Sequence, residues 1–293
     1  MSQILVDLGA KGTVIDDPLL INYLRANGGW QLTDIPEQQD TETVTVTAYY
    51  PENALWQEQL QKINAELLAI EKRIGKFRYG DLLFRTVTEE DWANEWKRYF
   101  HVTHVGERLV IRPSWENYTP AAGEKVITID PGMAFGTGTH HTTNMCMARL
   151  EKIVKPGMKV FDVGTGSGIL AIAAALLGAG NIKAVDIDAV AVRVAGENIA
   201  NNGLDCKIDV RVGDLLHGTE GKADLIIANI IADIVIQLIP DVAVKLNPGG
   251  TFLASGIIEE RAGDVERAAM EKGLKLSHME HRGGWVVMEF GMA

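Results

Sequence analysis

From about Thr142 to the end of the chain, short apolar runs alternate with longer runs that have helical spacing. Strands are expected over 159–163, 182–186, 207–212, 223–228 and 250–255, and helices over 168–178, 189–201, 232–245 and 259–272. Two closing strands, about 274–281 and 284–290, flank the hairpin-type turn Arg282-Gly283-Gly284. This pattern predicts an α/β fold, with a mostly parallel sheet, helices on both faces and a terminal antiparallel hairpin.

The first 88 residues follow a different pattern. Runs rich in β-branched residues predict strands over 12–15 and 43–49, an amphipathic run predicts a helix over 54–74, and 82–87 predicts a third strand. This order is most of a ferredoxin-like β-α-β-β-α-β unit that lacks its first strand and most of its first helix. We interpret Ile4 to Leu8 as the remnant of that helix.

The segment between these two patterns contains a charged run with two tryptophans, over 89–96, which predicts a short helix. Strands are expected over 108–112 and 125–130. We therefore divide the chain into a small α+β ferredoxin-like domain (1–88), a linker (89–118) and a larger α/β domain (119–293).

Composition excludes several classes of protein. With 46% hydrophobic and 23% charged residues, the chain resembles an ordinary globular protein. The longest apolar run, 169–177, is far shorter than the ~20 residues of a membrane span, and no basic and apolar leader opens the chain. Cys146 and Cys206 lack C-x-x-C spacing, which argues against a zinc site or a disulfide framework. We expect a cytoplasmic monomer without a bound metal.

The formal net charge is −11, from 39 acidic and 28 basic residues. Phosphate contacts require Lys and Arg, so this balance argues against direct binding of nucleic acid. It suits a basic macromolecular partner, such as a lysine-rich protein. Solubility alone would explain the same charge, so both readings remain open.

A glycine-rich turn follows the strand expected at 159–163. Gly164-Thr165-Gly166-Ser167-Gly168 precedes a helix, and the next strand ends in Asp186, 22 positions after Gly164. Strand, glycine turn, helix, strand and acid predict a site for a nucleoside-bearing cofactor, because the glycines allow close approach and the acid accepts from ribose hydroxyls. The alternative is a tight turn that binds nothing.

The glycine spacing argues against a dinucleotide. The G-x-G-x-x-G pattern of dehydrogenases would place its third glycine at position 169, which is Ile169. The observed D-x-G-x-G-x-G resembles the S-adenosylmethionine turn of class I methyltransferases. On that basis Gly164, Gly166 and Asp186 are candidate cofactor-binding residues.

A second glycine-rich stretch, 130–143, lies between a strand and a helix expected to start near Asn144. We interpret it as a lid over the methionine end of the cofactor, because long glycine-rich loops inside compact domains are usually functional. The candidate cofactor contacts are Phe135, Gly136, Thr137 and Thr143. The alternative is a solvated loop whose following helix is capped by Thr142 or Thr143.

Asn229 follows the fourth strand of the larger domain, where carboxyl ends of strands line the ligand cleft. Its side-chain amide is a candidate catalytic and cofactor-binding group that accepts a hydrogen bond from a substrate amine and aims the nitrogen lone pair. A helix cap is the alternative role. Asp214 is a candidate acceptor for the adenine amino group, and Asp188 is expected to cap the helix that begins at Ala189.

With these residues in place, the chain resembles the ribosomal protein L11 methyltransferases, the PrmA family. The resemblance rests on DPGMAFGTGTHHTT at 130–143, DVGTGSGILAIAA at 162–174, AVDID at 184–188 and ANIIA at 228–232. It implies a class I methyltransferase fold and S-adenosylmethionine-dependent methylation of the N-terminal α-amine and lysine ε-amines of that ribosomal protein. It also implies cofactor contacts by Thr143, Gly164, Asp186 and Asn229, and substrate recognition by the N-terminal domain.

Three other functions compete with this one. A class I enzyme acting on a small amine or on another protein would share the cofactor site, although a small substrate needs no separate docking domain. A non-enzymatic cofactor-binding protein would bind S-adenosylmethionine and methylate nothing. A dehydrogenase is disfavoured by Ile169.

Overall fold

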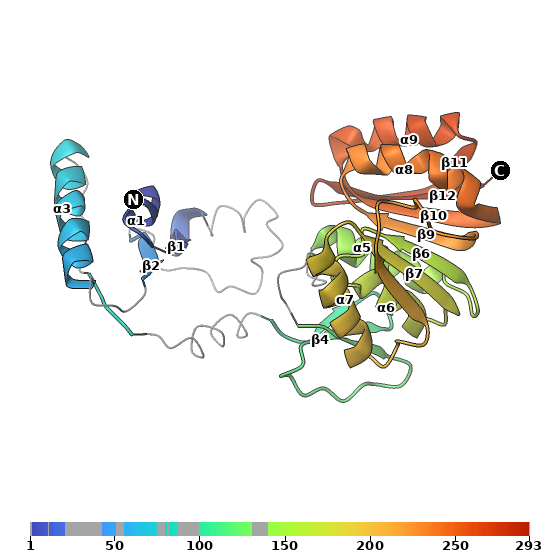
Figure 1. Cartoon of the computed structure of the whole chain (residues 1–293), viewed down its shortest axis with the longest axis horizontal. Helices are drawn as coiled ribbons and strands as arrows, with labels where there is room; N and C mark the ends of the chain where they lie inside the picture. The colour runs from blue at the N-terminus through green and yellow to red at the C-terminus, as the bar shows by residue number, and fades with distance from the viewer. Residues whose placement is uncertain are drawn as a thin grey trace. The chain divides into compact units, whose positions relative to one another are not determined.

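The computed structural model describes residues 2–10, 12–20, 43–50, 56–74, 80, 82–86, 100–130 and 140–292. The chain divides into two compact units, residues 1–91 and 92–293 (Figure 1). Within the described residues, no helix combines the length and the apolar character that a membrane crossing requires.

The described residues of the first unit include a pair of antiparallel strands, a short helix and a long helix. Their bounds are α1 Ser2–Asp7, β1 Gly12–Asp16, β2 Thr45–Tyr49 and α3 Trp56–Ile74. Ile15 pairs with Val46 across the two strands. A small core is formed by Leu5, Ile63 and Leu67, so α1 and the amphipathic α3 share one apolar contact. The strands and the long helix lie where the sequence predicted them.

The third strand predicted for this unit is wrong over the residues that the structure describes. Residues 82–86 have no regular secondary structure, and Leu83 is 92% exposed. An apolar run forms a strand only when a neighbouring strand and a core cover it, and β1 pairs only with β2 in the described sheet. The helix predicted over 89–96 lies outside the described residues.

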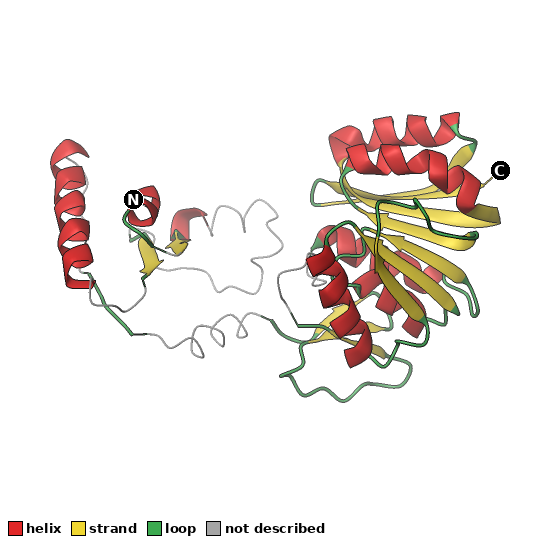
Figure 2. Ribbon diagram, in the orientation of Figure 1, coloured by secondary structure: helices red, strands yellow, loops and turns green. Residues whose placement is uncertain are grey.

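The second unit is built on a seven-stranded sheet with the strand order β11-β12-β10-β9-β6-β7-β8 (Figure 2). The strand bounds are β6 Lys159–Val163, β7 Asn181–Asp186, β8 Ile208–Val212, β9 Ala223–Asn229, β10 Leu246–Ile258, β11 Leu274–Arg282 and β12 Trp285–Met292. Strands β6 to β10 pair in parallel, and β12 is antiparallel to both β10 and β11. The predicted terminal hairpin is therefore confirmed.

Helices cover both faces of this sheet (Figures 1 and 2). Their bounds are α5 His141–Ile153, α6 Ile169–Leu176, α7 Ala189–Asn201, α8 Ala232–Lys245 and α9 Ala262–Glu271, with a short 3₁₀ turn at Glu259–Arg261. Val160 of β6 packs with α5, α6 and α7, whereas its neighbour Phe161 packs with α8 and α9. Because both faces are buried, the central strands are almost continuously apolar.

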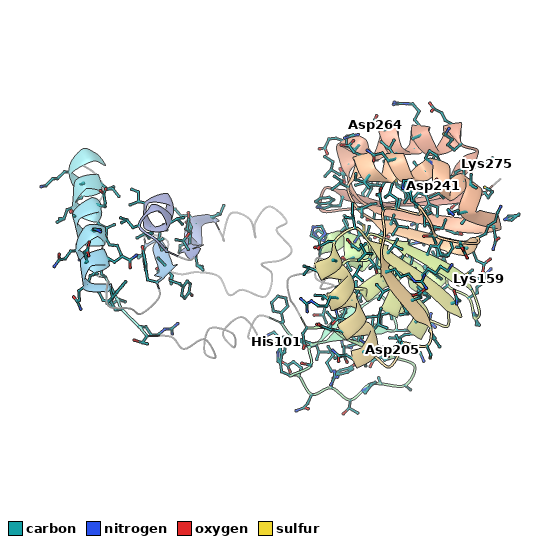
Figure 3. All side chains as sticks on the ribbon, viewed as in Figure 1. His101, Lys159, Asp205, Asp241, Asp264 and Lys275 are labelled. Carbon is teal, nitrogen blue, oxygen red and sulfur yellow. The ribbon has the colours of Figure 1, made fainter. Side chains whose placement is uncertain are left out.

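A small second sheet, β3-β4-β5, packs beside α5. Its strands are β3 Thr103–Val105, β4 Leu109–Arg112 and β5 Lys125–Thr128. Residues 103–112, which the sequence placed in the linker, thus form two strands of the second unit. Exposed charged side chains such as Lys159, Asp205 and Lys275 lie on the surface of this unit (Figure 3).

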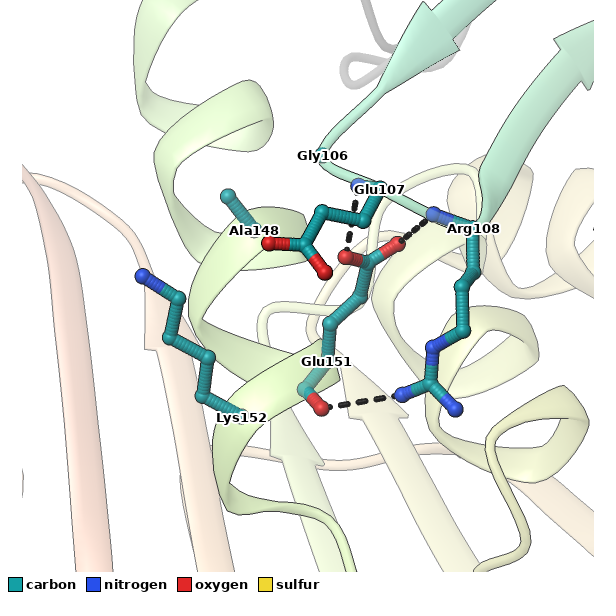
Figure 4. Close-up of a pocket in the computed structure, with 6 residues that line it drawn as sticks. All are labelled: Gly106, Glu107, Arg108, Ala148, Glu151 and Lys152. Atoms are coloured by element: carbon teal, nitrogen blue, oxygen red, sulfur yellow. Dashed lines mark hydrogen bonds between the residues drawn. The ribbon is translucent and has the colours of Figure 1, made fainter.

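Glu151 ties α5 to the turn between β3 and β4 (Figure 4). Its carboxylate accepts hydrogen bonds from the backbone N–H groups of Glu107, Arg108 and Leu109 at 2.8, 2.7 and 2.8 Å. The Arg108 guanidinium also donates to the Glu151 carbonyl oxygen at 2.9 Å. These residues line the pocket drawn in Figure 4, and their hydrogen bonds hold one side of α5 against the turn.

Candidate functional site

The glycine turn between β6 and α6 is held against the end of β7. Gly164, Gly166 and Gly168 have φ values of +70°, +56° and +83°, a conformation that glycine adopts without steric cost. The Gly164 N–H donates to the Val185 carbonyl oxygen at 2.9 Å. The turn thus leaves β6 sharply and delivers the chain into α6, as the sequence predicted.

Asp186 at the end of β7 reaches the centre of this turn. Its Oδ2 accepts from the Gly166 N–H at 2.9 Å, and its Oδ1 accepts from the Asp188 N–H at 3.0 Å. Each carboxylate oxygen has two acceptor sites, so both retain capacity for ligand hydroxyl groups. Asp188 accepts from the Val190 N–H at 2.8 Å, which confirms its predicted role as the cap of α7.

Asp162 lies beneath the turn and is fully buried. The Thr165 hydroxyl donates to its carboxylate at 2.6 Å. Burial raises the pKa of Asp162 to about 6, the Thr165 hydrogen bond opposes this shift, and the nearby Asp186 charge adds to it. Asp162 begins the DVGTGSGILAIAA motif, and its side chain braces the turn from inside the protein, a role that the motif alone did not indicate.

Thr143 and Asn229 meet at the carboxyl end of β9. Asn229 is the last residue of that strand, and Thr143 is fully buried in the first turn of α5. The Asn229 Nδ2 donates to the Thr143 Oγ1 at 3.3 Å. The Asn229 Oδ1 is buried and accepts no hydrogen bond from the residues that the structure describes. A strong acceptor is therefore left for a ligand, since buried polar groups are normally paired.

The start of α5 differs from the expectation that Thr142 or Thr143 caps a helix near Asn144. The helix begins at His141, and the Nδ1 of His140 accepts from the Thr142 N–H at 3.3 Å as its N-cap. Both threonine side chains are buried and turned inward, so they cannot serve as caps. Phe135, Gly136 and Thr137 lie outside the described residues.

The hairpin turn between β11 and β12 packs against this helix start, a contact that the sequence did not indicate. The rings of His140 and Trp285 meet edge to face with centroids 5.1 Å apart. A Cβ at Gly283 would lie 2.4 Å from the His141 ring, so the two groups are in close contact. Burial lowers the pKa of both histidines, and for His141 the charges of His140 and Arg282 lower it further.

Asp214 lies after the end of β8, at the same sheet edge as Asp186 but further out. Its side chain is 62% exposed and lies 3.4 Å from the Nδ1 of His217. Leu215, the next residue, has a φ of +51°, which is rare for a residue with a side chain. The backbone is therefore bent sharply where the candidate adenine contact was placed.

The residues at this edge fit a nucleoside-bearing cofactor with a reacting group at one end. Asp186 and the glycine turn offer a carboxylate beside glycine backbone. Asn229 ends β9, the strand next to β6, and its Oδ1 pairs with none of the described residues. Among the described residues, no group of three or more His, Cys, Asp or Glu could hold a metal ion.

Known proteins are similar to this chain in sequence. The family model described as ribosomal protein L11 methyltransferase (PrmA) matches residues 1–292. A ribosomal protein L11 methyltransferase of Symbiobacterium thermophilum is 47% identical over 288 residues, which cover 98% of this chain and 93% of that one. Its counterpart in Pelotomaculum thermopropionicum is 44% identical over 289 residues, covering 98% of this chain and 92% of the relative.

The fold is shared as well. A crystal structure of a ribosomal protein L11 methylase from Lactobacillus delbrueckii subsp. bulgaricus superposes with a TM-score of 0.62 at 39% identity, over 66% of this chain and 99% of that chain. The seven-stranded sheet with its terminal hairpin is the predicted class I methyltransferase fold. The chain therefore belongs to the ribosomal protein L11 methyltransferase (PrmA) family.

Proposed function

We propose that this protein transfers the methyl group of S-adenosylmethionine to amines of ribosomal protein L11, namely lysine ε-amines and the N-terminal α-amine. The observation that carries this proposal is the buried Oδ1 of Asn229, which none of the described residues pairs with. It lies at the sheet edge that also holds Asp186 and the glycine turn, where α/β folds bind their ligands.

Several residues of this edge would hold the cofactor. Asp186 would accept from the ribose hydroxyls, Gly164 and Gly166 would line the turn, Thr143 would contact the methionine end, and Asp214 would accept from the adenine amino group. Phe135, Gly136 and Thr137 belong to the glycine-rich stretch interpreted from its sequence as a lid, and we propose that they also contact the cofactor. When bound, S-adenosylmethionine supplies an electrophilic methyl group on a sulfonium.

Asn229 orients the amine that receives this methyl group. The amide Nδ2 is held by Thr143, so Oδ1 faces the site and accepts an N–H of the neutral amine. This contact points the nitrogen lone pair at the methyl carbon. Alignment and exclusion of water account for most of the rate enhancement in such a displacement.

The first unit is proposed to recognise the protein substrate. Residues 1–88 would dock L11 and 119–293 would form the methyltransferase domain, with 89–118, which includes β3 and β4, between them. Exposed apolar side chains such as Ile15, Leu83 and Phe84 supply a surface for a protein partner. The net charge of −11 favours a basic substrate over nucleic acid. We further propose that the enzyme acts in the cytoplasm as a monomer.

Methyl transfer from labelled S-adenosylmethionine tests this proposal, with purified L11 and a cell extract as parallel acceptors. Label in purified L11, mapped to its amines by mass spectrometry, supports the function as stated. Label only in another protein or in a small amine keeps the chemistry and replaces the substrate. No label in either sample, while calorimetry shows that cofactor is bound, contradicts the enzymatic function.

A further inference from the structure

Strand β10 contains a β-bulge beside the end of β9. Ala254 pairs with Met288 of β12, whereas Ile257 pairs with Val286, so three steps on β10 face two on β12. The extra residue falls at Ser255-Gly256, where Gly256 has a φ of +79°. Bulges are enriched next to active sites, where they redirect a strand or a side chain.

Ser255 connects this bulge to both neighbouring strands. It is fully buried, and its Oγ donates to the Val286 carbonyl oxygen at 2.8 Å. Its own carbonyl oxygen accepts from the Ile230 N–H at 3.0 Å. Ser255 is also the residue that pairs with Asn229 in the parallel ladder of β9 and β10. The bulge therefore begins level with Asn229.

Gly256 packs tightly against the backbone of Ile230, the residue that follows Asn229. A Cβ at Gly256 would lie 2.5 Å from the Ile230 carbonyl oxygen and 2.8 Å from its backbone nitrogen. These are main-chain atoms, which cannot rotate away as a side chain would. On the other side, a Cβ at Gly164 would lie 2.4 Å from the Ile230 Cγ2. Ile230 is thus confined between two glycines.

We propose that the Ser255-Gly256 bulge is a positioning element for methyl transfer. It fixes the Asn229–Ile230 peptide and thereby aims the Asn229 amide oxygen at the reacting amine. This inference rests on the proposed role of Asn229 in the reaction. A misplacement of about 1 Å in a reacting group is enough to cost on the order of 100-fold in rate. An added methyl group at Gly256 would force a displacement on that scale.

Gly256→Ala tests the proposal, with Gly249→Ala as its matched control. Both glycines lie on β10 and have left-handed φ values of +79° and +74°, but no heavy atom lies within 4 Å of a Cβ at Gly249. We expect Gly256→Ala to lower kcat for L11 methylation by about 10- to 100-fold. The Kd for S-adenosylmethionine, measured by calorimetry, should stay close to that of the wild type, and Gly249→Ala should leave both unchanged.

Ser255→Ala is the second variant, and it decides the matter if Gly256→Ala does not fold. It adds no atoms and removes only the hydroxyl that ties the bulge to Val286, so we expect kcat to fall while the Kd for cofactor stays constant. If the hydroxyl only stabilises the fold, Ser255→Ala should lower thermal stability without lowering kcat selectively at constant Kd for the cofactor. That result, or an equal fall of kcat in Gly249→Ala, overturns the proposal.

Asn229→Ala separates the failure of this inference from failure of the proposed function. If Asn229→Ala leaves kcat unchanged, the aiming role of Asn229 is wrong, and the bulge has nothing to position. If Asn229→Ala slows methylation while Ser255→Ala and Gly256→Ala do not, the function stands and the positioning role of the bulge is overturned.

Discussion

The Nδ2 of Asn229 lies 3.3 Å from the Oγ1 of Thr143, which joins the last residue of β9 to the first turn of α5. Because the amide nitrogen is engaged, the amide oxygen is presented to the opposite side, where no described residue pairs with it. In the proposed mechanism, this one buried hydroxyl therefore determines which end of the amide meets the substrate.

Thr143→Val should lower kcat about tenfold, since it keeps the shape of the side chain and removes one hydrogen bond of about 1.4 kcal/mol. Thr143→Ser retains the Oγ and should restore most of the rate. Steady-state methylation of L11 compares the two variants. Equal rates for Thr143→Val and Thr143→Ser would show that the Thr143 hydroxyl does not orient Asn229.

Asp186→Ala should weaken S-adenosylmethionine binding by about 1–3 kcal/mol, the scale of hydrogen bonds to a charged acceptor. Asp188→Ala is the control, because that carboxylate caps α7 through the Val190 N–H. It should cost about 1 kcal/mol of stability and leave the affinity for the cofactor unchanged. Calorimetry that finds unaltered affinity in Asp186→Ala would remove the ribose assignment.

The buried Asp162 should make stability depend on pH. Burial raises its pKa to about 6, above the 3.8 of an unperturbed Asp, so the folded protein binds more protons between these values. The free energy of unfolding should therefore fall as pH rises from about 4 to about 6, by about 3 kcal/mol from this group.

Asp162→Asn lacks this titration. Urea melts at several pH values give the free energy of unfolding of both proteins. Relative to Asp162→Asn, the wild type should be more stable at pH 4 than it is at pH 7. If the difference between the two proteins does not change with pH, Asp162 has the same pKa in the folded and the unfolded state.

Gly283→Ala should destabilise the protein more than Gly284→Ala, by about 1–3 kcal/mol, the cost of overpacking a filled site. The two neighbours have φ values of +59° and +78°, so backbone strain is similar in both variants. A Cβ at Gly283 would meet the buried His141 ring, whereas a Cβ at Gly284 would have no described heavy atom within 4 Å. Urea midpoints compare them, and equal losses would show that the His141 contact contributes little.

Leu83→Ser should raise KM for L11 by up to about tenfold without changing the Kd for S-adenosylmethionine, if the first unit docks the substrate. Leu83 is 92% exposed, so the change should not affect folding. Val244→Ser on α8, where the side chain is 67% exposed, is the control in the second unit and should alter neither constant. Unchanged KM in Leu83→Ser would argue against docking at this segment.

The parts of the structure that follow from short-range pattern were predicted from the sequence. Strand, turn and helix lengths placed Asp186 beside the glycine turn, because the intervening βαβ unit returns the chain to the adjacent strand. Threonine is favoured at the N-cap position, but here the imidazole of His140 caps α5, and Thr142 and Thr143 are buried in the first turn of the helix. Residues 82–86 failed as a strand because an apolar run forms one only beside a partner.

Contacts between distant segments were not predictable in this way. Thr143 and Asn229 were both singled out, yet their hydrogen bond spans 86 positions and depends on the packing of α5 against the sheet. The close approach of Gly256 to Ile230 depends on the strand order β10-β9-β6, which no local sequence pattern specifies. Gly256 directly follows the strand expected over 250–255, so the pattern gave no signal that a bulge would lie inside β10.

Single-turnover methylation of purified L11 by wild type and Asn229→Ala, at saturating S-adenosylmethionine, tests the central claim most directly. The account predicts that the wild type methylates L11 amines, and that Asn229→Ala binds the cofactor with unchanged affinity but transfers the methyl group about 100-fold more slowly. Equal rates in the two proteins, or L11 that stays unmodified with the wild type, would contradict it.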